Sequence, residues 1–411
     1  MPRIAQLAAA LILLVPARDA ERPLDRILLR NGKELTGHVV VDRGPDLVLA
    51  NGRKRKVLER AEVSEVLSAW RAMGEFMERY DQAVQGGSRS STELADWCDQ
   101  VGLEREAKLA SYLALLRDDN PEGVHARLES RESRGGWSIP WGRNWVALEE
   151  WRGEETARWA QAPALESSFF RVTSNSPALQ TLILFGDLKR GHLGWFRLAG
   201  DAIQQEHRVE LFEVALHGDE RSFDHLVGDP PAYYLDSKDR IEFDGLRNPG
   251  SSLIHHEVAH QMLAEASRQR KSRNGGAPAW VDEGLAEVLA QALASRDGFD
   301  ASREWLLSSS HYAVLRDLED PPRLDDLLAL GREEFHGGRD PRRNYALAYS
   351  FVVVCLGDVD SERRDRFLRF VGRLLDGDVR SDDLAEALGP SREGLISEWH
   401  QNMGFRKGRG R

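Results

Sequence analysis

Cysteine is scarce in this chain of 411 residues, which contains only Cys98 and Cys355. Two cysteines so far apart do not provide the disulfide framework that stabilises small secreted domains. Both have apolar neighbours, so we expect two buried thiols, with a single bridge between them as the alternative. No base or cation in the sequence is arranged to activate either thiol, so neither is a candidate nucleophile.

An excess of positive charge is also missing. Lys and Arg number 56 against 67 Asp and Glu, which gives a formal net charge of −11. This balance disfavours a nucleic-acid partner, because phosphate backbones attract basic surfaces. The basic run 53–56 follows the turn pair Asn51-Gly52 and is better explained as the exposed arm of a small sheet. We expect residues 406–411 to form a disordered basic tail.

Long hydrophobic runs are absent apart from a short one at the N-terminus. Residues 4–15 are mostly apolar and precede the small residues Ala17 and Ala20. A bilayer span needs about 20 apolar residues, whereas this shorter segment has the form of a secretory signal peptide. We therefore expect residues 1–20 to direct export to the periplasm or the cell exterior, with cleavage after Ala17 or Ala20. The mature protein would then have no membrane span, and an uncleaved anchor is the alternative.

The chain is long enough for two or three domains with a hydrophobic core. Residues 24–68 contain short strand-like segments separated by the turn pairs Asn31-Gly32 and Asn51-Gly52. The expected strands are 27–29, 34–41, 46–50 and 54–58. This pattern is typical of a small β-barrel of the SH3 or Sm type. Such modules contact other parts of a protein or a partner, so we assign it no chemistry.

Residues 69–160 are interpreted as a helical segment followed by a linker. Ser91 or Thr92 is expected to cap one helix, and residues 104–116 repeat apolar side chains at the spacing of another. The segment resembles tetratricopeptide-like helical hairpins, although no repeat period is present. The glycine- and tryptophan-rich stretch 135–145 is interpreted as the linker. A protein partner could bind the barrel or this helical segment.

Residues 165–405 are predicted to form a mixed α/β domain, which makes the whole protein α+β. The expected strands are 169–173, 208–216, 232–235 and 240–244, and the last two form a hairpin. A helix is expected over 176–199, between the first two strands, and residues 304–405 are expected to be helical.

The most informative motif is His256-Glu257-Val258-Ala259-His260, inside a segment that should be helical. Residues four apart lie on one face of a helix, so His256 and His260 can direct their imidazoles at one metal ion. Glu257 projects beside them, where its carboxylate can take a proton from water held by the metal. The neighbouring His255 lies about 100° around the helix and is expected to be structural. The sequence therefore predicts one Zn²⁺ per chain.

A third metal ligand is expected on the next helix. Zinc in catalytic sites usually takes three protein ligands and leaves one position to water. This helix should begin near Pro278 and carries Glu283 and Glu287, which share one face. One of them could bind the metal while the other braces a histidine. We expect Glu283 to be the ligand and Glu287 to be the supporting residue. A solvated acidic face, the alternative for this pair, fits poorly because both lie in an otherwise apolar run.

These two segments resemble the gluzincin metallopeptidases, zincin-like enzymes that pair His-Glu-x-x-His with a glutamate on a following helix. Residues 280–287 are similar to the Trp-x-x-Glu-Gly-x-Ala segment of aminopeptidase N-type enzymes, and residues 165–405 resemble exported bacterial peptidase-MA-like proteins. The resemblance implies that Glu283 is the third zinc ligand. The Gly-x-Met-Glu-Asn element that holds a substrate amino terminus in aminopeptidase N is missing. Zinc binding is therefore implied, but aminopeptidase specificity is not.

The resemblance also implies an oxyanion donor and a substrate site. In the related families a tyrosine near the start of a later apolar helix supplies the donor, and residues 344–357 have that character. We expect Tyr345 to be this donor, with Tyr349 and His336 as the alternatives. By the same resemblance, the hairpin at 234–243 could hold an extended peptide by strand addition.

The sequence thus predicts an exported zinc metallopeptidase that hydrolyses peptide bonds, either as an endopeptidase or as an exopeptidase. The rival hypothesis is a non-catalytic envelope scaffold that retains a structural zinc site and binds partners through its N-terminal modules. The two differ in the metal site. A structural zinc site is closed by a fourth protein ligand, whereas a catalytic one keeps a position open.

Overall fold

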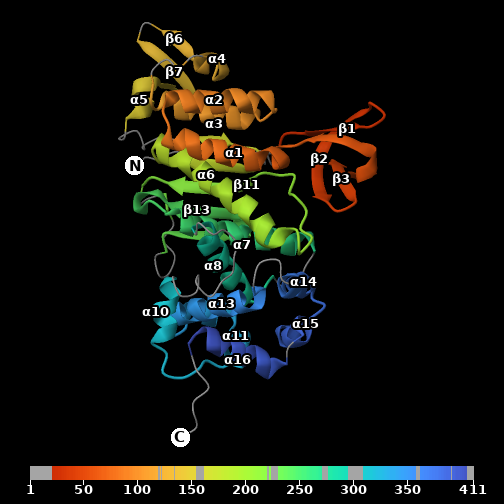
Figure 1. Ribbon diagram of the computed structural model, residues 1–411. Coiled ribbons are helices and arrows are strands. Elements are labelled where there is room, and N and C mark those ends of the chain that lie inside the picture. The colour runs from red at the N-terminus through yellow and green to blue at the C-terminus, as the bar shows by residue number, and fades with distance from the viewer. Residues whose placement is uncertain are drawn as a thin grey trace, which may run out of the picture.

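The computed structural model has a mixed α/β fold arranged as a stack of layers (Figure 1). It describes residues 21–118, 121, 123–133, 135–153, 162–219, 222–223, 230–270, 276–294, 309–357, 362–389 and 391–404. The predicted signal peptide, 1–20, and the predicted basic tail, 406–411, lie outside these residues. Within the described residues, no helix combines the length and the hydropathy needed to cross a membrane.

A five-stranded antiparallel sheet lies at one side of the stack (Figure 1). Its strands, in the order β4-β3-β2-β1-β5, are β1 Asp25–Leu29, β2 Glu34–Arg43, β3 Asp46–Asn51, β4 Lys54–Glu59 and β5 Val63–Leu67. The predicted turns join β1 to β2 and β3 to β4, with Gly32 and Gly52 at φ of 83° and 56°, a region that glycine enters without strain. The four strands expected from the sequence are confirmed, and the sheet has its own apolar core.

In its described residues, the next region contains five helices. These helices are α1 Ala69–Gln85, α2 Ser88–Gln100, α3 Glu104–Leu115, α4 Val124–Arg127 and α5 Leu148–Arg152. Of these, α1 and α3 pack against α6 Ala178–Trp195 of the third region. The predicted helix over 104–116 is confirmed as α3. The expected caps Ser91 and Thr92 are wrong, because α2 begins earlier with Gly87 as its N-cap, and Ser91 is buried within the helix.

The stretch 135–145 forms strands, so its interpretation as a linker is wrong. A three-stranded antiparallel sheet contains β6 Arg131–Ser133, β7 Gly136–Trp141 and β8 Asn144–Ala147. Ile139 and Trp141 lie on one face of β7 because strand side chains alternate, and both are buried. Trp141 packs against Tyr112 of α3 and Trp151 of α5. Packing against Tyr112, which is distant in the sequence, stabilises this glycine-rich stretch as a sheet.

The third region is built around a mixed five-stranded sheet. Its strands, in the order β12-β13-β11-β10-β9, are β9 Ala164–Glu166, β10 Phe170–Ser174, β11 Phe212–His217, β12 Ala232–Leu235 and β13 Arg240–Asp244. β10, β11 and β13 are parallel, whereas β12 and β9 pair antiparallel at the two edges. The hairpin predicted at 232–235 and 240–244 is confirmed. The strand predicted from residue 208 begins only at Phe212.

Helices cover this sheet and continue into a helical C-terminal region. They are α6 Ala178–Trp195, α7 Ser251–Gln269, α8 Ala279–Ala294, α10 Ser310–Arg316, α11 Leu324–Ala329, α12 Arg332–Gly337, α13 Pro341–Leu356, α14 Glu362–Asp376, α15 Leu384–Leu388 and α16 Arg392–Asn402. The short helical turns are η1 Arg60–Glu62, η3 Phe196–Gly200, η4 Asp236–Lys238, η5 Gly245–Arg247 and η6 Ser381–Asp383. Cys98 and Cys355 are both buried and unbridged, which confirms two separate thiols.

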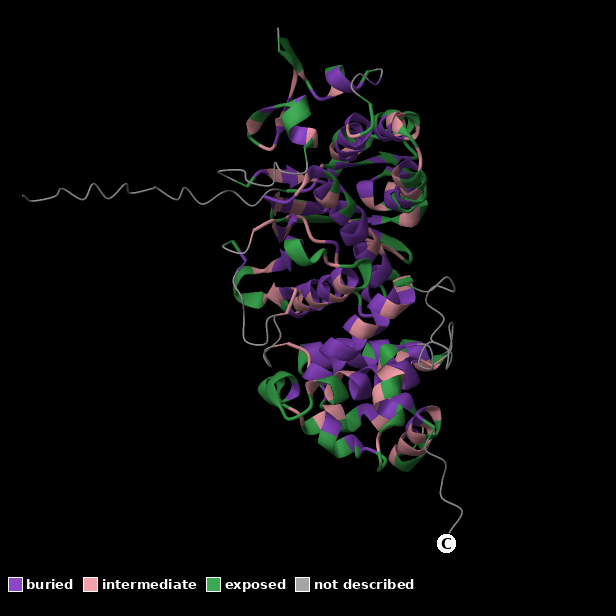
Figure 2. Cartoon of the chain, turned by 90° about the vertical axis from the view of Figure 1, so that its left-hand side faces the viewer, coloured by how far each residue is buried: buried purple, intermediate pink, exposed green. Residues whose placement is uncertain are grey.

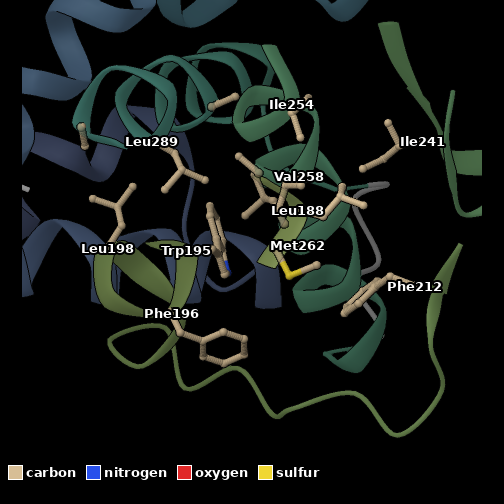
Figure 3. Close-up of a cluster of buried hydrophobic side chains, with 14 of the residues drawn as sticks. Leu188, Trp195, Phe196, Leu198, Phe212, Ile241, Ile254, Val258, Met262 and Leu289 are labelled. Carbon is tan, nitrogen blue, oxygen red and sulfur yellow. The ribbon is translucent and has the colours of Figure 1, made fainter. Parts of the chain in front are cut away.

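One continuous apolar core joins the helical segment to the last helices, and buried residues run through the interior of the stack in Figure 2. Around α7, Leu188 and Trp195 of α6 cluster with Val258 and Met262 of α7 and Leu289 of α8 (Figure 3). Burying one such side chain contributes about 1.5–3 kcal/mol. The cluster packs α6 and α8 against α7, the helix that carries the His-Glu-x-x-His motif.

Gly284 of α8 lets α13 pack close to that helix. A Cβ at this position would lie 2.9 Å from the backbone oxygen of Ala348 and 2.5 Å from the Val352 side chain. Since the α13 backbone cannot yield locally, Gly284→Ala should lower the free energy of unfolding by about 1–3 kcal/mol. Gly74→Ala on α1 is the matched control, because its Cβ would meet nothing within 4 Å. That change should stabilise by up to about 1 kcal/mol, and equal melting temperatures for the two variants would contradict the close packing.

Candidate metal centre

The three predicted metal ligands lie together between α7 and α8. His256 and His260 occupy adjacent turns of α7, and Glu283 lies in the first turns of α8. His256 Nε2 lies 3.0 Å from His260 Nε2, and each of these nitrogens lies 3.4 Å from Glu283 Oε2. The side chains of all three residues are largely buried. The helical spacing and the packing of two helices therefore bring three donor atoms to one point.

This donor set fits a zinc ion. In a tetrahedral site with bonds of about 2.0–2.1 Å, neighbouring ligand atoms lie about 3.3–3.4 Å apart, close to the separations found here. Glu283 Oε2 is buried without a hydrogen-bond partner, which is costly unless a cation satisfies that oxygen. Two histidines and one glutamate are also a ligand set that catalytic zinc sites use.

Carboxylates of α8 brace both histidines from behind. Nδ1 of His260 lies 2.6 Å from Oδ1 of Asp282, and Nδ1 of His256 lies 3.4 Å from Oε1 of Glu287. Partners of this kind fix the ring orientation and the tautomer that leaves Nε2 free for a metal. Glu287 was expected to contact a histidine, but Asp282 was missed. The sequence did offer a signal for this contact, because Asp282 is an acidic residue directly before the expected ligand Glu283.

Charge at the site favours a cation. Burial disfavours the charged form of His256, yet Glu283 and Glu287 outweigh it and raise the pKa of that imidazole. Burial also opposes charge on His260, but Asp282 and Glu283 raise its pKa well above the ordinary value. Despite burial, the two imidazoles hold the pKa of Glu283 well below its usual range. Three ionised carboxylates around two imidazoles thus create a negative potential that attracts a cation.

Glu257 lies beside the ligands and is almost completely buried, with 6% of its surface exposed. The backbone N–H of Tyr234 on β12 faces its carboxylate and favours the charged form. Burial raises the pKa of Glu257, and the imidazoles of His260 and His256 oppose this rise without cancelling it. A carboxyl group with a raised pKa can hold a proton between two steps of a reaction. His255 is buried on the side of α7 that faces α6, and burial lowers its pKa to about 3.

Among the described residues, β12 is an edge strand of the mixed sheet, and it lies next to Glu257. At the start of β12, the backbone N–H of Asp244 donates to the oxygen of Pro231 at 2.9 Å. Hydrogen-bonded pairs alternate along an antiparallel ladder, so the backbone groups of Ala232 and Tyr234 point away from β13. The Tyr234 N–H that reaches Glu257 is one of these outward groups. An extended chain placed along this edge would therefore run past the carboxylate.

Tyr345 and His336 border the same site, whereas Tyr349 does not. Oη of Tyr345 lies 3.0 Å from Nδ1 of His336, and Nε2 of His336 lies 3.4 Å from Oε1 of Glu283. Burial and nearby carboxylates, first of all Glu283, raise the pKa of Tyr345, so its hydroxyl stays a proton donor. Tyr349 is fully buried one turn further along α13, beside the ring of His311.

Among the described residues, no fourth His, Cys, Asp or Glu joins the three that could hold a metal ion. The metal-ligating group contains His256, His260 and Glu283, and His336 approaches the other oxygen of Glu283. No family model, curated protein or solved structure matches this chain. The chemistry open to the site therefore follows from its own geometry. It offers three ligands to one cation, a buried carboxyl group beside them and a phenolic donor across from them.

Proposed function

We propose that this protein is an exported, zinc-dependent metallopeptidase of the gluzincin type. The observation that carries the proposal is the triangle of His256, His260 and Glu283 with Glu257 beside it and outside the ligand set. The resemblance of the two helical motifs to gluzincins supports the same reading, as does the signal-like segment at 1–20. A zincin-like domain over 165–405 would carry the chemistry.

Zinc, when bound, would activate water and polarise the scissile carbonyl. Glu257 would accept a proton from the attacking water as the new C–O bond forms. It would then pass this proton to the amide nitrogen as the C–N bond breaks, which its raised pKa favours. The hydroxyl of Tyr345 would donate a hydrogen bond to the oxygen that becomes negative during the attack.

The edge strand β12 supports a peptide as substrate. Backbone groups of Ala232 and Tyr234 point away from β13, and the N–H of Tyr234 faces Glu257, so an extended peptide could add to the sheet and present one of its bonds to the site. A substrate bound through its backbone is held in a sequence-tolerant way, with side-chain pockets supplying any selectivity. The barrel-type module at 24–68 and the tetratricopeptide-like helices would bind partners or position substrates and would perform no chemistry.

Metal content is the first test of this function. The purified mature protein, dialysed against a weak chelator, should retain about one zinc per chain in elemental mass spectrometry, as a three-ligand site requires. The zinc-loaded protein should cleave members of a peptide library. A chain without bound metal would contradict the proposal. A chain with zinc but no cleavage of any peptide or protein substrate would instead favour the scaffold with a structural metal site.

Tyr345→Phe should lower kcat for peptide hydrolysis by about 10²-fold, because the loss of one oxyanion donor costs about 10²–10³-fold. Zinc content and KM should change little, since the hydroxyl contacts His336 and is not among the metal ligands. Tyr349→Phe is the matched control and should retain kcat. An equal loss in both variants, or a loss only in Tyr349→Phe, would remove Tyr345 from the mechanism.

A further inference from the structure

Both ligand histidines are connected to the C-terminal helical region through a chain of two contacts. Oδ1 of Asp282 contacts His260, and its other oxygen lies 2.7 Å from Nη2 of Arg332. Glu287 repeats the pattern: Oε1 faces His256, and Oε2 lies 2.8 Å from Nε2 of His311. Each bracing carboxylate is therefore held on one oxygen by a histidine ligand and on the other by a residue from a later helix.

The two outer residues come from different elements. His311 lies in α10 and Arg332 opens α12, and both helices pack against α13. The carboxylates are well shielded, with 10% of the Asp282 side chain and 16% of the Glu287 side chain exposed. Arg332 is more exposed, at 55% of its side chain, so its role is to hold Asp282 from the solvent side.

We propose that Arg332 and His311 are positioning residues for the metal, each fixing the carboxylate that orients one histidine ligand. The proposal rests on the proposed function to the extent that it assumes a metal at the three-residue site. It goes further, because it makes metal affinity depend on α10 and α12, which contribute no ligand. Docking of the C-terminal helices and metal binding are then linked, and each strengthens the other.

Two physical effects of Arg332 have opposite signs, and this makes the proposal testable. As a positive charge near the metal, Arg332 repels a cation, so its removal would tighten metal binding if charge were all that mattered. As a donor to Asp282, it stops the carboxylate from rotating about its soft terminal torsion and keeps the short contact to His260. If positioning dominates, removal of the guanidinium loosens the metal.

The experiment measures zinc affinity by competition with a chromophoric chelator, which needs no enzymatic assay. Arg332→Met keeps the apolar stem and should weaken zinc binding by about 3- to 10-fold, less than the 10–100-fold that loss of a direct partner costs. Arg332→Lys keeps a charged N–H donor and should recover most of the affinity. His311→Phe should weaken binding to a similar extent. The Co²⁺-substituted variants should show an altered visible absorption spectrum, because the ligand geometry changes.

Double variants separate positioning from general destabilisation. Arg332 acts through Asp282, so Asp282→Ala with Arg332→Met should bind zinc no more weakly than Asp282→Ala alone. Arg332 acts on His260 and His311 acts on His256, so the fold losses of zinc affinity in Arg332→Met and His311→Phe should multiply in the double variant. Arg316→Met on α10 is the matched control, since its partner is the exposed Asp317, and it should leave zinc affinity unchanged.

The possible outcomes distinguish this inference from the proposed function. Wild-type protein that binds no zinc would overturn both. Wild-type protein that binds one zinc, with unchanged or tighter binding in Arg332→Met and His311→Phe, would overturn the positioning role and leave the metallopeptidase intact. Weaker binding in Arg332→Met that Arg332→Lys does not recover would show that a charged N–H donor to Asp282 does not support the site, and would also overturn it.

Discussion

Glu257→Gln is expected to reduce peptide hydrolysis by about 10²- to 10⁴-fold, the range that a positioned general acid or base contributes. Glutamine has nearly the shape of glutamate but cannot accept a proton at neutral pH. The amide oxygen can still face the backbone N–H of Tyr234, as the carboxylate does. The fold around α7 should therefore persist while proton transfer is lost.

Zinc content separates this prediction from simple damage to the site. Glu257 does not belong to the ligand group, so the variant should still bind about one zinc per chain. Glu265→Gln is the matched control on the same helix, where the carboxylate pairs with Arg268, and its activity should stay within a few-fold of the wild type. Full activity in Glu257→Gln would exclude Glu257 as the proton carrier.

Glu283→Ala is expected to have the second large effect, the loss of stoichiometric zinc and with it all activity above background. The change removes one of three ligands and leaves the two imidazole nitrogens 3.0 Å apart with no carboxylate ligand beside them. Zinc sites need the complete ligand set to hold the ion against a chelator. Elemental analysis after dialysis should therefore give well below one zinc per chain.

Glu242→Ala provides the control for this variant. Glu242 is also buried and is also bonded to a histidine, His217, at 2.6 Å. It lies on β13 and is not part of the metal-ligating group. Loss of stability from removing a buried carboxylate that contacts a histidine should occur in both variants, but loss of zinc only in Glu283→Ala. Equal zinc content in the two proteins would show that Glu283 is not a ligand.

Much of the fold could be predicted because its signals are local. The turn pairs Asn31-Gly32 and Asn51-Gly52 marked the hairpins of the first sheet, since glycine takes the positive φ that these turns require. Apolar spacing predicted α3 to within one residue at its end. The hairpin of β12 and β13 was recognisable from its short apolar runs.

One error in the fold arose where a partner distant in the sequence decides the structure, and another arose at a helix that begins with polar residues. The stretch 135–145 became a sheet because Trp141 packs against Tyr112 and Trp151, which no local pattern shows. α13 begins at Pro341 with Asp340 as its cap, one turn before residue 344, where the sequence pattern placed the start of this helix. Polar residues at the first turn carry no periodic apolar signal, so the helix start was placed too late.

For the candidate site, the sequence by itself determined the spacing of the donor atoms. His256 and His260 share a face because 3.6 residues complete a turn, and Glu283 follows on a second helix. Only the tertiary structure decided that α8 meets α7 with Glu283 Oε2 at 3.4 Å from both nitrogens. It alone also brought Arg332 to Asp282 across 50 residues. The spacing of residues within one helix follows from backbone periodicity. The contacts of Glu283 and Arg332, by contrast, depend on side-chain packing between helices that are far apart in the chain.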